Sequence, residues 1–164
     1  MQAFAALALL GVAAAASPPP LADEALVRAY VQRHGNQTFR PPSGQLKFPY
    51  LVPGGYYQQL WDWDSYQTGV ALLEHGSAPF LAGSMKNFLS GVNLTDGQVP
   101  GCLTPAGASP AIYHVKPVVI QGAWIGASYS KDWAQFKPFL AQMKVQTTHI
   151  GIQLWIHFGS NSCC

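Results

Sequence analysis

Aromatic rings and carboxylates are concentrated in residues 56–66, which read Tyr-Tyr-Gln-Gln-Leu-Trp-Asp-Trp-Asp-Ser-Tyr. Flat hydrophobic faces beside anionic acceptors suit a sugar, because its C–H faces stack on rings while its hydroxyls donate to carboxylates. The stretch therefore predicts one wall of a carbohydrate site. Core packing is the alternative, since aromatic clusters near the start of a helix are more often core anchors.

The two carboxylates of this stretch are predicted to have different roles. If a helix begins near Trp61, side chains at Asp62 and Asp64 lie on different faces, because they are two positions apart. One carboxylate can then satisfy the helix N-terminus while the other points elsewhere. We expect Asp62 to be the capping or buried residue and Asp64 to contact the ligand.

The seven acidic residues supply no convincing catalytic pair. Glycoside hydrolysis needs an acid and a base about 6.5–9.5 Å apart for inversion, or about 5–5.5 Å for retention. Asp62 and Asp64 are close in sequence but diverge on a helix. No Gly-x-Ser-x-Gly elbow occurs, and none of the five histidines has helical ligand spacing. We expect no catalytic residue in this chain, no metal and no cofactor.

Residues 114–128 are apolar nearly all round, which predicts an inner helix with His114 at its start. Lys116 and Gln121 are polar exceptions in this segment, so they must find partners or face a cavity. Ligand contact and a satisfied core position are about equally favoured for them.

Composition limits the class of protein. Of the 164 residues, 49% are hydrophobic and 10% are charged, and the net charge of +2 is spread thinly. This predicts one domain that is neither disordered nor a nucleic-acid binder.

The N-terminus has features of a secreted protein. Residues 1–16 form an apolar, alanine-rich run that predicts a signal peptide and is too short to span a membrane. The sequons at Asn36 and Asn93 predict glycosylation in the secretory lumen or outside the cell. Three cysteines, with Cys102 isolated in a loop, predict neither a disulfide framework nor a metal site.

Periodicity and turn signals predict mainly helices. Helices are expected at 22–33, at 61–74 with a stop at His75 and Gly76, and from Pro79 onward. Another is expected at 131–144, interrupted by Pro138, with its buried face formed by Trp133, Phe136, Phe139, Leu140 and Met143. Residues 38–51 predict a strap over the surface, and residues 93–110 a long loop.

The stretch from Pro53 to Ser65 resembles the signature of mannosylglycerate and glucosylglycerate hydrolases, which belong with trehalases and processing glucosidases among the six-hairpin glycosidases. Residues 114–124 and 137–140 resemble the same pattern. The resemblance covers about 49–144 and implies an (α/α)6 toroid, inversion at an α-linked glycosidic bond, and no metal.

Carried over by position, the resemblance implies that Tyr57, Trp61, Trp63 and Asp64 line the subsite for the non-reducing sugar. Lys116 stands where many relatives have glutamine, and it joins Gln121 as a candidate substrate contact. The acid and base of the family lie in parts of the domain with no counterpart here.

The expected organisation follows from this resemblance. The four segments are a signal peptide (1–16), a helix and proline-rich strap (17–48), the first part of an all-α toroid of about two hairpins (49–146), and an unrelated tail (147–164). The resemblance predicts part of a secreted glycosidase that acts on a small α-glucoside or α-mannoside and is inactive alone. The alternative is a non-catalytic secreted carbohydrate-binding module.

Overall fold

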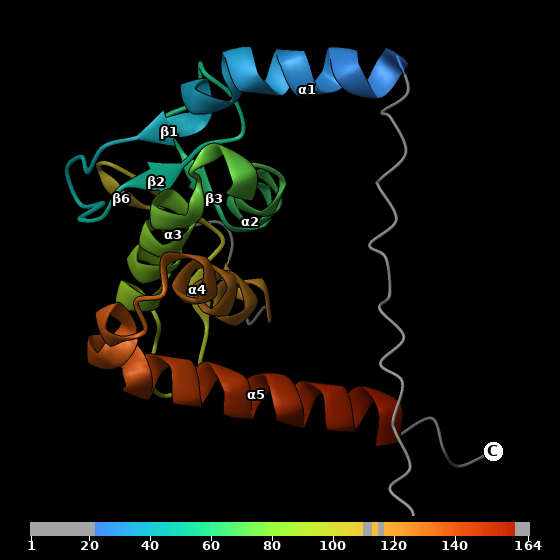
Figure 1. Cartoon of the computed structure of the whole chain (residues 1–164). Helices are drawn as coiled ribbons and strands as arrows, with labels where there is room; N and C mark the ends of the chain where they lie inside the picture. Colours follow the sequence, from blue (N-terminus) through green and yellow to red (C-terminus); the bar gives the residue numbers. More distant parts are fainter. Residues whose placement is uncertain (1–21, 110–112, 115–116, 160–164) are drawn as a thin grey trace, which may run out of the picture.

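The computed structural model describes residues 22–109, 113–114 and 117–159, and the predicted signal peptide lies outside them. Figure 1 shows the helices in chain order: α1 (Ala22–His34), α2 (Asp62–Ala71), α3 (Ala78–Ser90), α4 (Pro117–Ser130) and α5 (Leu140–Gly159). Three 3-10 turns lie between them: η1 (Gly35–Thr38), η2 (Leu73–His75) and η3 (Ala134–Phe139).

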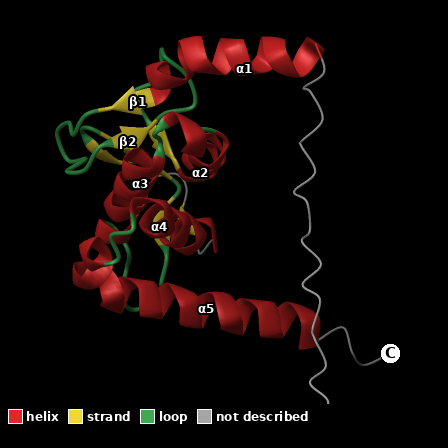
Figure 2. Ribbon diagram, viewed as in Figure 1, coloured by secondary structure: helices red, strands yellow, loops and turns green. Residues whose placement is uncertain are grey.

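The strands are short and antiparallel (Figure 2). They are β1 (Phe39–Arg40), β2 (Tyr50–Leu51), β3 (Leu60–Trp61), β4 (Val99–Pro100), β5 (Cys102–Thr104), β6 (Gly107–Ala108) and β7 (Tyr113–His114). β1 pairs with β2, β5 lies between β3 and β6, and β4 pairs with β7. Because helices dominate the described residues, the predicted all-α class is confirmed.

Helix α3 lies at the centre of the core, packed against α2, α4 and β2. The short connection between α2 and α3 makes them an antiparallel hairpin. Gly76 ends this connection in the left-handed conformation (φ 84°), which confirms the predicted stop. Pro79 lies in the first turn of α3, as predicted. The arrangement corresponds to part of an (α/α)6 toroid.

Two segments differ from the prediction. The strap does not lie over the surface, since Leu46, Tyr50 and Leu51 are buried in the core. The predicted loop at 93–110 contains β4, β5 and β6, and Cys102 is buried in a strand. Both segments are extended because proline and glycine exclude helices there, yet their backbone groups still need hydrogen-bond partners.

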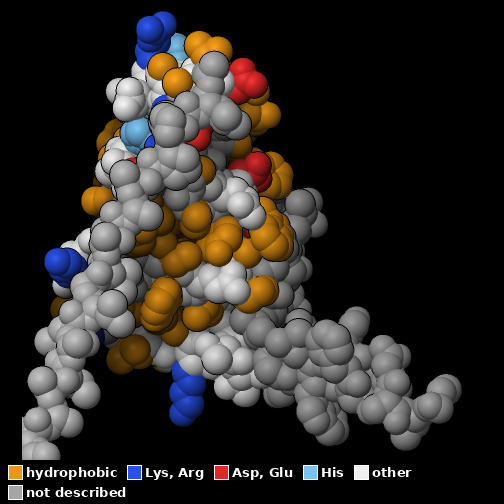
Figure 3. Space-filling model, turned by 45° about the vertical axis from the view of Figure 1, so that its right-hand side comes forward, with side chains coloured by type: hydrophobic (Ala, Val, Ile, Leu, Met, Phe, Trp, Pro, Cys, Tyr) orange, Lys and Arg blue, Asp and Glu red, His pale blue; other side chains and the backbone are white. Residues whose placement is uncertain are grey.

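Helix α4 begins at Pro117, whereas His114 belongs to β7 and pairs with Val99. Its small residues, such as Ala123 and Ala127, are buried, but Trp124 is 59% exposed. The prediction of a helix buried on all sides is therefore wrong for the described structure. Trp133 and Leu140 are also exposed, in contrast to the predicted buried face, whereas Phe136 is buried. Figure 3 shows hydrophobic side chains gathered over the middle of one face.

The first and last helices extend beyond the body in the same direction (Figure 1). Helix α5 contacts α3 and α4 and runs without a break past residue 147, where the unrelated tail was predicted to begin.

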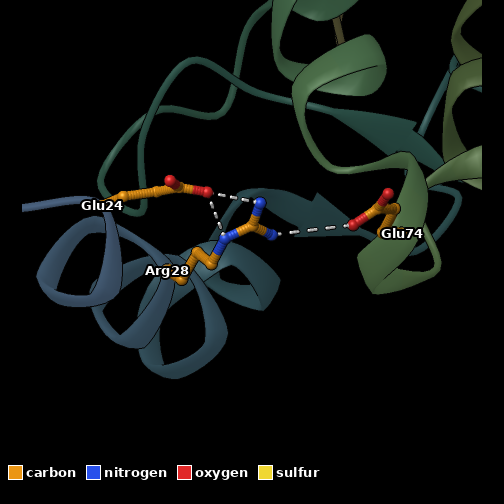
Figure 4. A network of polar contacts seen from close by, with 3 residues as sticks. All are labelled: Glu24, Arg28 and Glu74. Carbon is orange, nitrogen blue, oxygen red and sulfur yellow. Dashed lines mark hydrogen bonds and ion pairs between the residues drawn. The ribbon is translucent and has the colours of Figure 1, made fainter. Parts of the chain in front are cut away.

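In α1, Arg28 pairs with Glu24 at 2.7 Å and reaches Glu74 of η2 at 4.0 Å (Figure 4). These exposed ion pairs contribute little to stability, because solvent screens them. None of the described helices is both long and apolar enough to cross a membrane.

We predict that Gly83→Ala destabilises the fold by at least about 2 kcal/mol, because a Cβ there would overlap the carbonyl oxygen of Pro49. The clash outweighs the gain in helix propensity of about 1 kcal/mol. Urea unfolding followed by circular dichroism measures the change. Gly91→Ala is the control, since its Cβ would make only ordinary contacts near Pro100. Equal stability of the two variants would contradict the prediction.

Candidate carbohydrate-binding site

The aromatic stretch is held in place at both ends. At its start, the amide of Tyr57 donates to the carbonyl of Gly54 at 3.0 Å and closes a tight turn. At its end, β3 pairs with β5, so that Trp61 lies opposite Cys102. The amide of Asp62 then donates to the carbonyl of Gly101 at 3.1 Å, and α2 begins. A local turn at Gly54 and a distant segment at Gly101 and Cys102 therefore fix the backbone of the aromatic stretch.

The carboxylates of Asp62 and Asp64 point to different environments. Asp62 is 3% exposed, and its Oδ1 accepts a hydrogen bond from the amide of Trp63 at 2.7 Å. Burial raises the pKa of the Cys102 thiol, and the charge of Asp62 raises it further, so the carboxylate lies near this thiol. Asp64 is exposed. The buried role predicted for Asp62 agrees with this geometry, and the ligand role of Asp64 stays a prediction.

The aromatic side chains are not sealed in the interior. Trp63 is 46% exposed, whereas Tyr57 and Trp61 are half-buried. Tyr56 is 83% exposed, and its ring lies 4.4 Å from that of Tyr57. A hydrogen bond with Tyr56 and the electrostatic interaction with that residue raise the pKa of Tyr57. Desolvation and the Asp64 carboxylate make smaller contributions. The two phenol rings therefore lie side by side.

The other candidates belong to other segments of the chain, and one of them is outside the described residues. Lys116 lies outside the described residues. Gln121 is exposed on α4, a helix that packs against α2, and Trp124 follows one turn later on the same face. Asn36 is exposed in η1, and Asn93 is exposed with its Oδ1 accepting from the amide of Thr95 at 2.9 Å.

Two hollows in the described structure lie on other segments than the four predicted subsite residues. One hollow of about 310 Å³ lies behind the turn at Gly54 and Gly55, between α1 and the end of α2. Another, of about 350 Å³, lies between α3 and the β5–β6 turn. Neither is lined by Tyr57, Trp61, Trp63 or Asp64. Among the described residues, no cluster of three metal-ligating side chains is present.

Two residues that contact Tyr57 were not among the sequence candidates. Tyr56 could have been included, because it adjoins Tyr57 in the same aromatic stretch. Arg40 gave no signal, since it is a single cation in a proline-rich segment, but its guanidinium contacts the carbonyls of Gly55 and Tyr57.

An all-α hairpin with an aromatic and acidic wall at the start of its first helix is the arrangement expected of a six-hairpin glycosidase, a class of glycoside hydrolase. The trehalase family matches residues 19–100, which are half of the chain, so the chain belongs to this family. The match includes the strap and the aromatic stretch, and it ends before α4.

Individual relatives agree with this assignment. The cytosolic neutral trehalase of Saccharomyces cerevisiae is 34% identical over 58 residues, which are 34% of this chain and 8% of the relative. The periplasmic trehalase of Shigella flexneri serotype 5b is 40% identical over 55 residues (34% and 10%), and that of Pseudomonas aeruginosa is 34% identical over 76 residues (46% and 13%). The chain spans about a tenth of these relatives. No solved structure gives a significant match.

We predict different effects on stability for substitutions of the two aspartates. Asp62→Asn should lower the free energy of unfolding by about 1–3 kcal/mol, because a buried charged acceptor is replaced by an amide. Asp64→Asn should leave stability within about 0.5 kcal/mol, since the residue is exposed. Thermal unfolding followed by circular dichroism checks both. A loss of stability in Asp64→Asn alone would reverse the assignment.

Proposed function

We propose that Tyr57, Trp61, Trp63 and Asp64 form part of the subsite for the non-reducing sugar of a small α-glycoside in an inverting glycosidase. The observation that carries this proposal is the placement of Trp63 and Asp64 at the start of α2, where both side chains reach the surface instead of the core. An exposed indole beside an exposed carboxylate offers a stacking face and a hydroxyl acceptor.

An α-glucoside is the preferred substrate class. The relatives described above are trehalases, and trehalose is an α-glucoside, so the similarity favours a glucoside over an α-mannoside. A glucosylglycerate-like substrate, which the signature also suggests, differs in the leaving group, and a mannosylglycerate-like substrate differs in the transferred sugar as well. Lys116 and Gln121 remain candidates for contacts to that part of the substrate.

The residues of this chain should bind sugar without cleaving it. Inversion needs an acid and a base on opposite sides of the scissile bond. Asp62 is buried and Asp64 is exposed, so this pair cannot span a substrate. A non-catalytic binding module would behave in the same way, and the two proposals differ only in whether a longer protein with this wall hydrolyses the sugar.

We predict that the chain binds trehalose and methyl α-D-glucopyranoside and releases no glucose. Trp63→Ala should weaken binding at least about tenfold, or about 1.4 kcal/mol, because the stacking face is lost. Calorimetric titration and a glucose assay measure the two properties. Trp133→Ala is the matched control, since Trp133 is 52% exposed but lies beyond the end of α4. Equal loss in both variants would argue against the subsite.

We also propose that the protein enters the secretory pathway, on the basis of the apolar run at 1–16 and the exposed sequons. Expression of the full chain in a eukaryotic host should give a secreted product that loses mass with peptide N-glycosidase. Asn36→Gln and Asn93→Gln should each remove one glycan, because both side chains are exposed. An unglycosylated product retained inside the cell would contradict this prediction.

A further inference from the structure

The guanidinium of Arg40 joins two segments that are separate in sequence. Its Nη1 donates to the carbonyls of Gln37 at 2.8 Å and Phe39 at 3.0 Å. Its Nη2 donates to the carbonyls of Gly55 at 2.6 Å and Tyr57 at 3.1 Å. The cation therefore binds four backbone oxygens, two before β2 and two in the turn that opens the aromatic stretch.

These contacts differ from those of an ordinary surface arginine. Arg28, for comparison, pairs with the carboxylates of Glu24 and Glu74. Within the described residues, Arg40 makes no ion pair, and its bonds go to carbonyls whose positions follow the backbone. Bonds from a charged donor are the stronger kind, and the planar fork of arginine fixes direction as well as distance.

The backbone of the turn has few other hydrogen bonds, although the side chain of Tyr57 packs against the hydrophobic core. Residues 57–59 belong to no strand or helix, and the first ladder bond comes at Leu60. The amide of Tyr57 bonds within its own turn, and the hydroxyl of Tyr50 reaches the carbonyl of Gln58 only at 3.4 Å. Since Arg40 holds the carbonyls on both sides of Tyr56, it fixes the backbone that carries both phenol rings.

We propose that Arg40 is a positioning residue of the sugar site, which holds the Tyr56–Tyr57 ring pair against the wall formed by Trp63 and Asp64. The expected effect of Arg40 on sugar binding rests on the proposed function. Its effect on the position of the two rings does not. The rings of Tyr56 and Tyr57 lie 4.4 Å apart, so one backbone clamp can position both.

The test compares Arg40→Gln and Arg40→Lys with the control Arg28→Gln, which removes the same charge from an exposed carboxylate pair. The ring resonances of Tyr57, assigned by their loss in Tyr57→Phe, report the position of the ring pair by NMR. The indole N–H resonance of Trp133 reports the fold elsewhere. We expect the Tyr57 resonances to move toward unstructured values in Arg40→Gln, to move less in Arg40→Lys, and to stay unchanged in Arg28→Gln. The Trp133 resonance should be constant throughout.

Binding of methyl α-D-glucopyranoside should weaken at least about tenfold in Arg40→Gln, with partial rescue in Arg40→Lys. Unchanged Tyr57 resonances in a folded Arg40→Gln protein would overturn the proposal, as would shifts that Trp133 shares. If Arg40→Gln does not fold, the lysine variant decides by the same criteria. If the unsubstituted chain binds no sugar, the proposed function fails, and the Tyr57 resonances still decide whether Arg40 positions the rings.

Discussion

The contact between the strap and helix α3 is the constraint on which the rest of the structure depends. The strap is extended and buried, so its backbone groups need partners that a sheet would normally provide. Helix α3 supplies them from side chains. Asn87 accepts from the amide of Phe48 at 3.1 Å and donates to its carbonyl at 3.0 Å, which copies the exchange of a strand pair. Ser84 accepts from the amide of Leu51 at 2.9 Å.

Close approach makes these bonds possible. Gly83 leaves room for the carbonyl of Pro49 directly on the helix, and Ser65 of α2 donates to the carbonyl of Leu51 at 2.9 Å. The strap is thereby fixed between α2 and α3. It leads directly into the turn at Gly54 and Gly55, while α2 carries Trp63 and Asp64. The same packing therefore sets both halves of the candidate site.

The sequence was informative where a local signal decides the structure. The hairpin of α2 and α3 followed from Gly76 and Pro79, because their backbone preferences act within one or two residues. The separate environments of Asp62 and Asp64 followed from helical geometry. The burial of the strap could not be predicted, since a proline-rich segment with Leu46 and Tyr50 has the same sequence pattern whether it covers a surface or crosses a core. Its burial depends on hydrogen bonds to the side chains of Ser84 and Asn87, which lie 33 and 39 residues further along the chain.

The exposed tryptophans show that hydrophobicity alone does not predict burial. Trp124 and Trp133 were expected inside because they are large and apolar, yet they meet edge to face at the surface, with centroids 6.3 Å apart. Trp63 is exposed to a similar degree, so exposure alone does not mark a sugar site. Trp133 also adjoins an exposed carboxylate, that of Asp132, which accepts a hydrogen bond from the amide of Gln135 at 3.2 Å, whereas Asp64 lies in the first turn of α2 within the aromatic stretch. A sugar needs polar groups beside the ring to fix its orientation, so the surrounding stretch, and not the ring alone, marks the candidate site.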